Sequence, residues 1–362
     1  DFEASDGHLY VASALGLVIV NVADPTSPST VATVAVLGST DRMAVSGRTV
    51  LVAGLVHPDG GRSVRALDVS DPAHPQEAGL LELADHPAPR RAPFAPGGDI
   101  TDIAMGHGRA YLTTDYVAGV APARGYVAVL DPATASPLRP LAAVATVSGR
   151  DVAASSHRAY VLGGGSLQLV DVSQPSAPRM LSSLSGLVGG VGVAAEGQAL
   201  FVVDSAGLLA VVDASDAALP RVVGKLHVAD RANSLTVSNG TAYVAAGAQG
   251  LRLVDVREPS MPTAIGSIDT GWATDVVVSG TRAAVVGPRQ LAILDVSDPA
   301  APAVLGSTAT SVALPADVSL QGELAYVVSR WLEDSPGLVL VDCRDPAAPR
   351  VAAELEWPFY SA

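Results

Sequence analysis

Short apolar runs recur along the whole chain at a spacing typical of strands in a repeated unit. Eight of them end in Asp or Asn and lead into a turn that is usually rich in proline. The runs are Leu17–Asn21, Val64–Asp68, Val127–Asp131, Leu167–Asp171, Leu209–Asp213, Leu251–Asp255, Leu291–Asp295 and Leu338–Asp342. A period of about 40 to 45 residues with strand-like content is what the blades of a β-propeller produce.

The unit over residues 230–270 shows how each repeat divides into strands. Its pattern predicts strands over 235–238, 242–245, 251–256 and 263–268. Asn239-Gly240 favours a hairpin because both residues tolerate positive φ. The third strand is apolar nearly throughout, as expected when neighbouring blades cover both of its faces. We therefore predict an all-β, eight-bladed β-propeller with four antiparallel strands per blade; seven blades with one irregular unit is the alternative.

The phase of the repeat gives the domain limits. Residues 2–7 align with residues 235–240, so the chain starts at the first strand of a blade. We expect one domain over 1–362, with a long insertion over 84–98. The expected blades span about 1–38, 39–83, 99–147, 148–187, 188–229, 230–270, 271–310 and 311–357. Because residue 1 already lies within a repeat, we expect any leader peptide to have been removed ahead of it.

The turn after the apolar run carries a family resemblance. At 295–302 it reads Asp-Val-Ser-Asp-Pro-Ala-Ala-Pro. This pattern resembles the LVIVD-repeat family over essentially the whole chain, although the third repeat departs from it at Asp131-Pro132. The resemblance implies a bacterial exported propeller, extracellular, on the cell surface or periplasmic. It carries no catalytic residues over to this chain.

Composition narrows the classes of partner. A net charge of −14 argues against nucleic acid and against an anionic membrane surface, which both bind basic proteins. The apolar stretches are too short to predict a transmembrane helix. The single cysteine, Cys343, cannot form an intrachain disulfide. It stands where sister repeats carry Val, so we interpret it as a small buried hydrophobe.

The candidate binding residues lie in unusually long connections. In a propeller the B-to-C and D-to-A connections share one face, and here they are extended in blades 2, 3 and 8 and at 84–98. Blades 8, 1, 2 and 3 are contiguous, so these connections would gather on one sector, where binding is commonly found. Simple drift in loop length is the alternative. The candidates are His57, Asp59, Asp85, His86, Arg90, Arg91, Asp115, Tyr116, Arg124, Trp331 and Glu333.

A second candidate set recurs at the start of the first strand of several blades. Its members are Asp1, Asp102, Asp151, Asp275 and Asp317, which symmetry would place around the mouth of the channel. Such carboxylates could attract calcium, which prefers oxygen ligands. We favour a structural role, because an Asp at a strand start commonly accepts hydrogen bonds from nearby amides. No other cofactor or metal is predicted.

Signals for catalysis are weak. The seven histidines show no zinc-binding spacing, and the sequence has no nucleophile elbow or phosphate-binding loop. The leading hypothesis is a non-catalytic exported or cell-surface scaffold that binds a protein or glycan through the long connections. One alternative is a propeller hydrolase or lyase acting at the channel mouth or through His57, Asp85, His86 and Tyr116. Another is a self-associating subunit of a surface assembly.

Overall fold

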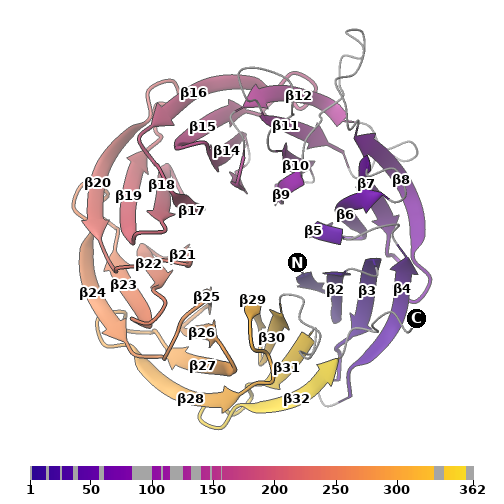
Figure 1. Cartoon of the computed structure of the whole chain (residues 1–362), viewed down its shortest axis with the longest axis vertical. Coiled ribbons are helices and arrows are strands. Elements are labelled where there is room, and N and C mark those ends of the chain that lie inside the picture. The colour runs from indigo at the N-terminus through magenta and orange to yellow at the C-terminus, as the bar shows by residue number, and fades with distance from the viewer. Residues whose placement is uncertain are drawn as a thin grey trace. The chain divides into compact units, whose positions relative to one another are not determined.

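The computed structural model describes residues 2–13, 16–24, 27–35, 40–56, 61–83, 100–106, 109–114, 125–131, 140–146, 149–155, 157–329 and 338–355. Its elements form eight sheets, each made of four strands that follow one another in the chain and pair antiparallel (Figure 1). The fold is the predicted eight-bladed β-propeller, and the seven-bladed alternative is wrong. Within the described part of the chain there is no helix long and apolar enough to cross a membrane.

The chain divides into two compact units with four blades each. Unit 1 comprises Asp1–Asn21, Ser29–Val188 and Ala217–Leu219. Unit 2 comprises Val22–Pro28, Gly189–Asp216 and Pro220–Ala362. We refer to the four strands of each blade as A to D in chain order. The A-to-B and C-to-D turns form the turn end of a blade, and the B-to-C and D-to-A connections form its connection end.

Unit 1 contains blades 1 to 4. Blade 1 consists of β1 (Phe2–Ser5), β2 (His8–Ser13), β3 (Gly16–Asn21) and β4 (Ser29–Ala35). Blade 2 consists of β5 (Thr40–Ser46), β6 (Thr49–Val56), β7 (Gly61–Asp68) and β8 (Gln76–Leu83). Blade 3 consists of β9 (Ile100–Gly106), β10 (Arg109–Thr114), β11 (Gly125–Leu130) and β12 (Pro140–Thr146). Blade 4 consists of β13 (Asp151–Ala154), β14 (Arg158–Gly163), β15 (Ser166–Asp171) and β16 (Arg179–Ser185).

Unit 2 contains blades 5 to 8. Blade 5 consists of β17 (Gly190–Glu196), β18 (Ala199–Asp204), β19 (Leu208–Asp213) and β20 (Arg221–His227). Blade 6 consists of β21 (Ser234–Ser238), β22 (Thr241–Ala245), β23 (Leu251–Asp255) and β24 (Thr263–Ile268). Blade 7 consists of β25 (Asp275–Ser279), β26 (Arg282–Gly287), β27 (Gln290–Asp295) and β28 (Ala303–Ala309). Blade 8 consists of β29 (Pro315–Gln321), β30 (Leu324–Ser329), β31 (Leu338–Asp342) and β32 (Arg350–Leu355).

The hydrophobic core lies between successive sheets. Between blades 6 and 7, Tyr243 and Leu253 pack with Val276 and Val285, and all four are buried. Because both faces of the C strand are covered in this way, its residues are apolar at successive positions rather than at alternate ones. Cys343 is buried in the equivalent cluster of blades 7 and 8, and burial raises the pKa of its thiol to about 11. It is therefore the buried hydrophobe that the sequence predicted.

The proline turns explain a glycine that recurs in the D strand. In unit 2 each such glycine lies against the carbonyl oxygen of a proline in the next blade: Gly224 against Pro259, Gly266 against Pro299, and Gly306 against Pro346. A Cβ at any of these positions would overlap that oxygen. Because glycine has no Cβ, the C-to-D turn of one blade can pack closely against the D strand of the blade before it.

Candidate functional site

The candidate residues of the long connections lie outside the described part of the chain. These are His57, Asp59, Asp85, His86, Arg90, Arg91, Asp115, Tyr116, Arg124, Trp331 and Glu333. The strands that lead into one of these connections are described. In blade 2 the pairing of β6 and β7 extends to Val56 opposite Gly61, and each of these strands has 8 residues where β18 and β19 of blade 5 have 6.

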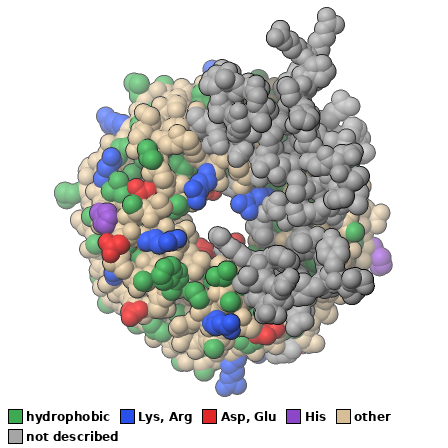
Figure 2. Space-filling view, viewed as in Figure 1, with side chains coloured by type: hydrophobic (Ala, Val, Ile, Leu, Met, Phe, Trp, Pro, Cys, Tyr) green, Lys and Arg blue, Asp and Glu red, His purple; other side chains and the backbone are tan. Residues whose placement is uncertain are grey.

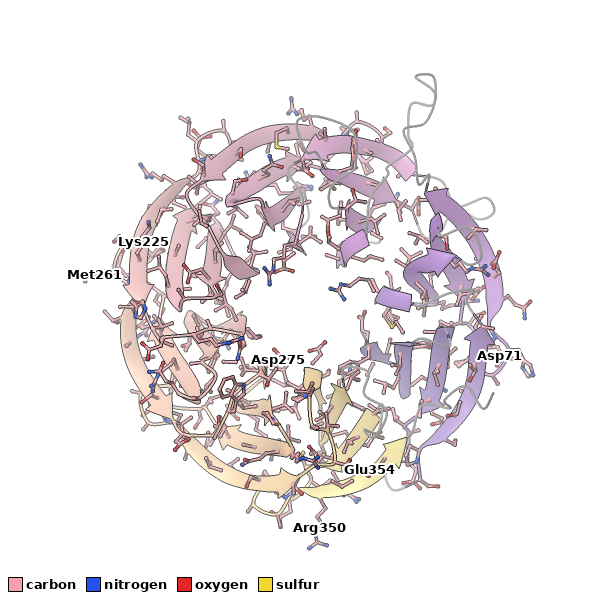
Figure 3. The ribbon with its side chains drawn as sticks, viewed as in Figure 1. Asp71, Lys225, Met261, Asp275, Arg350 and Glu354 are labelled. Carbon is pink, nitrogen blue, oxygen red and sulfur yellow. The ribbon has the colours of Figure 1, made fainter. Side chains whose placement is uncertain are left out.

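Four of the strand-start aspartates occupy equivalent positions in their sheets. Each lies opposite the same position of its B strand: Asp102 opposite Thr113, Asp151 opposite Leu162, Asp275 opposite Val286, and Asp317 opposite Val328. Asp1 and the side chain of Asp102 lie outside what the structure describes. Asp275 lies at the A-strand edge of its sheet, whereas Lys225 of β20 lies at the D-strand edge of blade 5 (Figure 3).

Asp275 and Asp317 form a carboxyl pair in unit 2. Asp275 Oδ2 accepts a hydrogen bond of 3.0 Å from the backbone N–H of Val318, and Asp317 Oδ1 accepts one of 2.8 Å from the same group. Burial, followed by the adjacent charge of Asp275 and a hydrogen bond to it, raises the pKa of Asp317 well above its usual range. The pair therefore holds a proton more tightly than two solvated carboxylates would.

Other side chains of the A strands also connect neighbouring blades. Glu3 Oε2 accepts a hydrogen bond of 2.8 Å from the N–H of Val45, and Thr236 Oγ1 donates one of 3.0 Å to the carbonyl of Val276. Asp275 likewise connects its blade to the next one through the N–H of Val318. Among the described side chains, no three His, Cys, Asp or Glu residues are grouped so that they could hold a metal ion.

An exposed aromatic and cationic surface lies at the connection end of unit 2. Trp272, in the β24-to-β25 connection, is 45% exposed, and the Arg231 guanidinium of the preceding connection lies 5.9 Å from the centroid of its ring. Leu314 takes the equivalent position in the next connection and is 49% exposed. Arg289, in the β26-to-β27 turn, is also exposed. Figure 2 shows hydrophobic and basic side chains beside one another on this end of unit 2. We name these four residues the Trp272 patch.

The backbone beneath Trp272 is fixed by hydrogen bonds. Ala273 and Gly247 exchange two backbone hydrogen bonds of 2.9 and 3.1 Å, and Asn233 Nδ2 donates one of 2.8 Å to the carbonyl of Ala273. Gly247 has a φ of +56°, and a Cβ there would lie 3.6 Å from the Trp272 ring. These contacts hold the backbone that carries the Trp272 indole in place.

Arg289 adopts a backbone conformation that its sister residues reach as glycines. Its φ is +60°, and the equivalent Gly165 and Gly207 have φ of +75° and +79°. A left-handed residue with a side chain costs roughly 1–2 kcal/mol. Neither Arg289 nor Trp272 was predicted from the sequence as a candidate residue. Two signals in the sequence could have indicated these residues. One is an Arg where two other repeats carry Gly, and the other is a Trp in a short connection.

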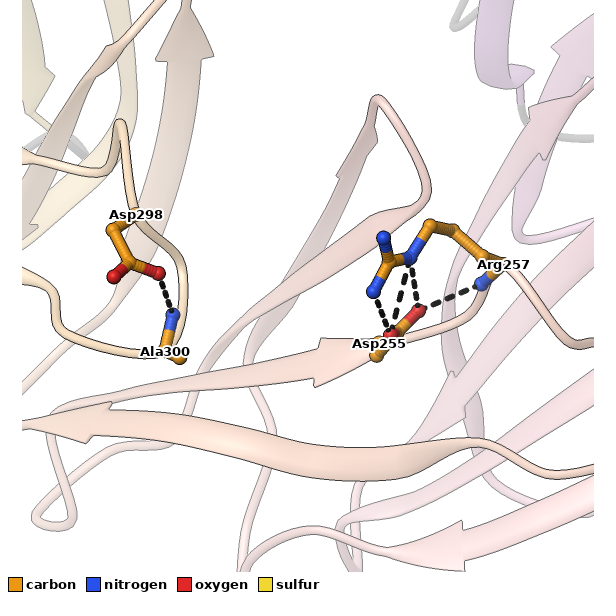
Figure 4. A network of polar contacts seen from close by, with 4 residues as sticks. All are labelled: Asp255, Arg257, Asp298 and Ala300. Carbon is orange, nitrogen blue, oxygen red and sulfur yellow. Dashed lines mark hydrogen bonds and ion pairs between the residues drawn. The ribbon is translucent and has the colours of Figure 1, made fainter.

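In six of the blades, the Asp that follows the apolar run of the C strand caps the next turn. Asp255 Oδ1 accepts a hydrogen bond of 3.0 Å from the N–H of Arg257 and also pairs with its guanidinium, as Figure 4 shows beside the Asp298–Ala300 turn. Hydrogen bonds from the side chain and backbone of Arg257 lower the pKa of Asp255 to about 2. The same cap joins Asp68 to Ser70, Asp171 to Ser173, Asp213 to Ser215, Asp295 to Ser297 and Asp342 to Arg344. This residue is structural.

The repeat itself decides the family. The LVIVD repeat matches residues 1–36, 37–81, 148–185, 191–228, 229–270, 271–310 and 315–354. The chain belongs to the LVIVD-repeat family. Blade 3, at which the sequence departs from the LVIVD pattern, has no match, yet β9–β12 form the same four-stranded sheet. No curated protein matches this LVIVD-repeat chain in sequence.

Solved structures share the fold at low identity. The computationally designed Ika8 protein is 10% identical, with a TM-score of 0.68 over 90% of this chain and 91% of that one. A protein from Lactobacillus plantarum is 12% identical, with a TM-score of 0.61 over 98% and 97%. Sqt1 of Saccharomyces cerevisiae is 9% identical, with a TM-score of 0.62 over 97% and 93%. At such low sequence identity, these structures show only that this LVIVD-repeat protein shares their fold.

Proposed function

We propose that this LVIVD-repeat protein is a non-catalytic binding scaffold, exported or displayed at the cell surface, which holds a protein or glycan at the connection ends of its blades. The observation that carries the proposal is the exposed, preplaced pair of Arg231 and Trp272. Large aromatic residues and arginines provide most of the binding energy in many interfaces.

Two further features support binding at this end. The Trp272 ring is held over Gly247 by a fixed backbone, so little conformational entropy is lost when a partner binds. Arg289 retains a strained conformation, and strain of this kind clusters where side chains have a function. We further propose that the long connections of blades 8, 1, 2 and 3, including 84–98, bind ligand as well.

The test is a binding screen followed by three variants. The purified protein is applied to a glycan array and to a peptide array, and the selected ligand is titrated by calorimetry. Trp272→Ala and replacement of residues 85–97 by a short Gly-Ser turn should each weaken binding at least about tenfold, the loss expected for an interface anchor. Met261→Ala serves as the control, because Met261 is 68% exposed but lies in the β23-to-β24 turn, at the turn end.

The thermal unfolding midpoint of each variant must match that of the parent protein for the comparison to hold. Unchanged affinity in both Trp272→Ala and the loop replacement would contradict the proposal. So would a screen in which the parent protein binds no ligand on either array.

A further inference from the structure

The Trp272 patch lies among side chains whose hydrogen-bonding groups are only partly used. Trp272 is 45% exposed, and no group in the described part of the chain accepts a hydrogen bond from its indole N–H. A buried indole usually has such a partner. Because this ring is not buried, both its face and its N–H are open to a ligand.

Three side chains meet over the backbone of Gly247. A Cβ at that position would lie 3.6 Å from Arg231 Cδ, 3.7 Å from Asn233 Nδ2 and 3.6 Å from Trp272 Cζ2. Asn233 Oδ1 accepts a hydrogen bond of 3.0 Å from Arg231 Nε, which orients the guanidinium beside the ring. The two terminal nitrogens of Arg231 have no partner among the described residues, so their N–H groups remain for a ligand.

Two glutamines add amide groups close to this cluster. Gln249 Oε1 accepts a hydrogen bond of 2.8 Å from the N–H of Asp230, which leaves the amide nitrogen of Gln249 as a donor. Gln290 Oε1 would lie 3.5 Å from a Cβ on Gly271, the residue before Trp272. Within the ranges that the structure describes, the Gln290 amide makes no hydrogen bond, so it can both donate and accept.

The charges around the indole balance. Arg231 and Arg289 are exposed cations, and Asp230 and Asp269 are exposed anions. Asp269 Oδ1 accepts a hydrogen bond of 2.9 Å from the N–H of Gly271, which leaves its second oxygen as an acceptor. The local charge therefore favours neither an anionic nor a cationic ligand.

A neutral sugar ring matches this combination of an aromatic face and mixed polar groups. Each sugar hydroxyl both donates and accepts, and planar amides, carboxylates and guanidinium groups can bind two neighbouring hydroxyls at once. A pyranose ring with equatorial hydroxyls presents its C–H bonds on a flat apolar face. The electron-rich face of an indole attracts such C–H groups.

An aromatic anchor of a protein interface has different surroundings. Its neighbours exclude water and contribute little energy of their own. Around Trp272 the neighbours are amides and charged groups with unused hydrogen-bonding capacity. An apolar partner would leave these groups unpaired, which is unfavourable.

We propose that the Trp272 patch binds a neutral oligosaccharide. One pyranose ring stacks on the exposed face of Trp272, and its hydroxyls exchange hydrogen bonds with Arg231 and Gln290. This inference rests on the proposed scaffold function and names the class of ligand that the site takes.

The experiment uses two neutral hexaoses and an acidic one. Cellohexaose, chitohexaose and hexagalacturonate are each titrated into the full chain and followed through the indole N–H resonance of Trp272. That resonance is identified by its absence in Trp272→Phe. We expect at least one neutral hexaose to shift it, and hexagalacturonate, which carries a carboxylate on every ring, to bind no more tightly.

Variants at the ring separate stacking from general hydrophobicity, with affinities measured by calorimetry. Trp272→Phe keeps a flat aromatic face and should bind the neutral hexaose only severalfold more weakly. Trp272→Leu keeps an apolar side chain without that face and should lose at least about tenfold. Equal affinities of these two variants would overturn the stacking contact.

A polar variant tests the hydrogen bonds and serves if Trp272→Leu does not fold. Gln290→Leu removes the unused amide at nearly constant size and should weaken binding of the neutral hexaose severalfold. Gln198→Leu is the matched control, because Gln198 is exposed at the turn end of unit 2, and it should leave binding unchanged. Equal losses in both glutamine variants would contradict the proposal.

Other outcomes distinguish this inference from the scaffold proposal. If Trp272→Ala weakens binding of an array-selected peptide while neither neutral hexaose binds, the ligand class is wrong and the scaffold proposal stands. If hexagalacturonate binds more tightly than both neutral hexaoses, the neutral class is likewise wrong. If neither the hexaoses nor any array ligand binds, both proposals are overturned.

Discussion

Asp275 and Val318 join two neighbouring blades through a hydrogen bond of 3.0 Å from the backbone N–H of Val318 to Asp275 Oδ2. Asp317 shares this N–H, so two carboxyl groups meet at one donor. The repeated Asp at the start of the A strand thus serves the contact between blades in unit 2. A proton held by the pair reduces the repulsion between the two groups.

The carboxyl pair makes stability depend on pH. Because the pKa of Asp317 is raised in the folded state, its contribution to stability is complete below its unfolded pKa of about 3.9 and is lost as pH rises through the folded value. Asp317→Asn keeps the neutral form at every pH. We expect it to match the parent protein near pH 4 and to be more stable at pH 8 in urea unfolding. A difference that does not change with pH would contradict this assignment.

The capping aspartate predicts the opposite dependence. The pKa of Asp255 falls to about 2 on folding, so its contribution is present above the unfolded pKa of about 3.9 and is lost as pH falls toward about 2. Asp255→Asn can still accept the hydrogen bond of the cap but not the ion pair, and blade 1 already carries Asn21 at this position. We expect Asp255→Asn to be less stable at pH 7 and the gap to narrow at pH 2.5. A constant gap in urea midpoints would argue against the ion pair.

The glycine beneath each proline turn predicts a steric effect. In Gly224→Ala the new Cβ would overlap the carbonyl of Pro259, so the free energy of unfolding should fall by roughly 1–3 kcal/mol. Gly192→Ala is the control, because its Cβ would meet only Leu235 at 3.9 Å. Its stability should stay within about 0.5 kcal/mol of the parent protein. Equal losses of stability in the two variants would show that overlap with the Pro259 carbonyl does not cause the destabilisation.

The backbone of Arg289 predicts a gain in stability on substitution. Arg289→Gly relieves the left-handed strain that Gly165 and Gly207 avoid, and we expect the free energy of unfolding to rise by about 0.5–1 kcal/mol. Because Arg289 belongs to the Trp272 patch, the same variant should bind the array-selected ligand more weakly. Loss of stability in thermal unfolding would mean that the side chain of Arg289 stabilises the fold.

The fold could be predicted from the sequence because several local signals specify the same four-stranded unit. The apolar C strands, the Asn239-Gly240 hairpin and the capping aspartates all encode the same unit, and the strands of blade 6 lie where they were expected. Blade 3 shows the limit of the motif, since it forms its sheet without matching the LVIVD repeat.

The candidate sites were harder to predict from the chain. The long connections were visible as insertions, and their residues lie outside the described part of the structure. Trp272 gave no insertion signal because it occupies a connection of ordinary length. The φ of Arg289, the contact of Arg231 with the indole and the exposure of Trp272 and Leu314 became apparent only in the structure.

A partner bound at the connection ends of the blades would shield the backbone amides of these connections from solvent. Hydrogen–deuterium exchange of the parent protein, with and without its array-selected ligand, measures this shielding. We expect new protection in peptides that cover residues 229–233 and 270–274, with further protection over 84–98. Protection restricted to the turns that follow the C strands, or none in these three segments at saturating ligand, would contradict it.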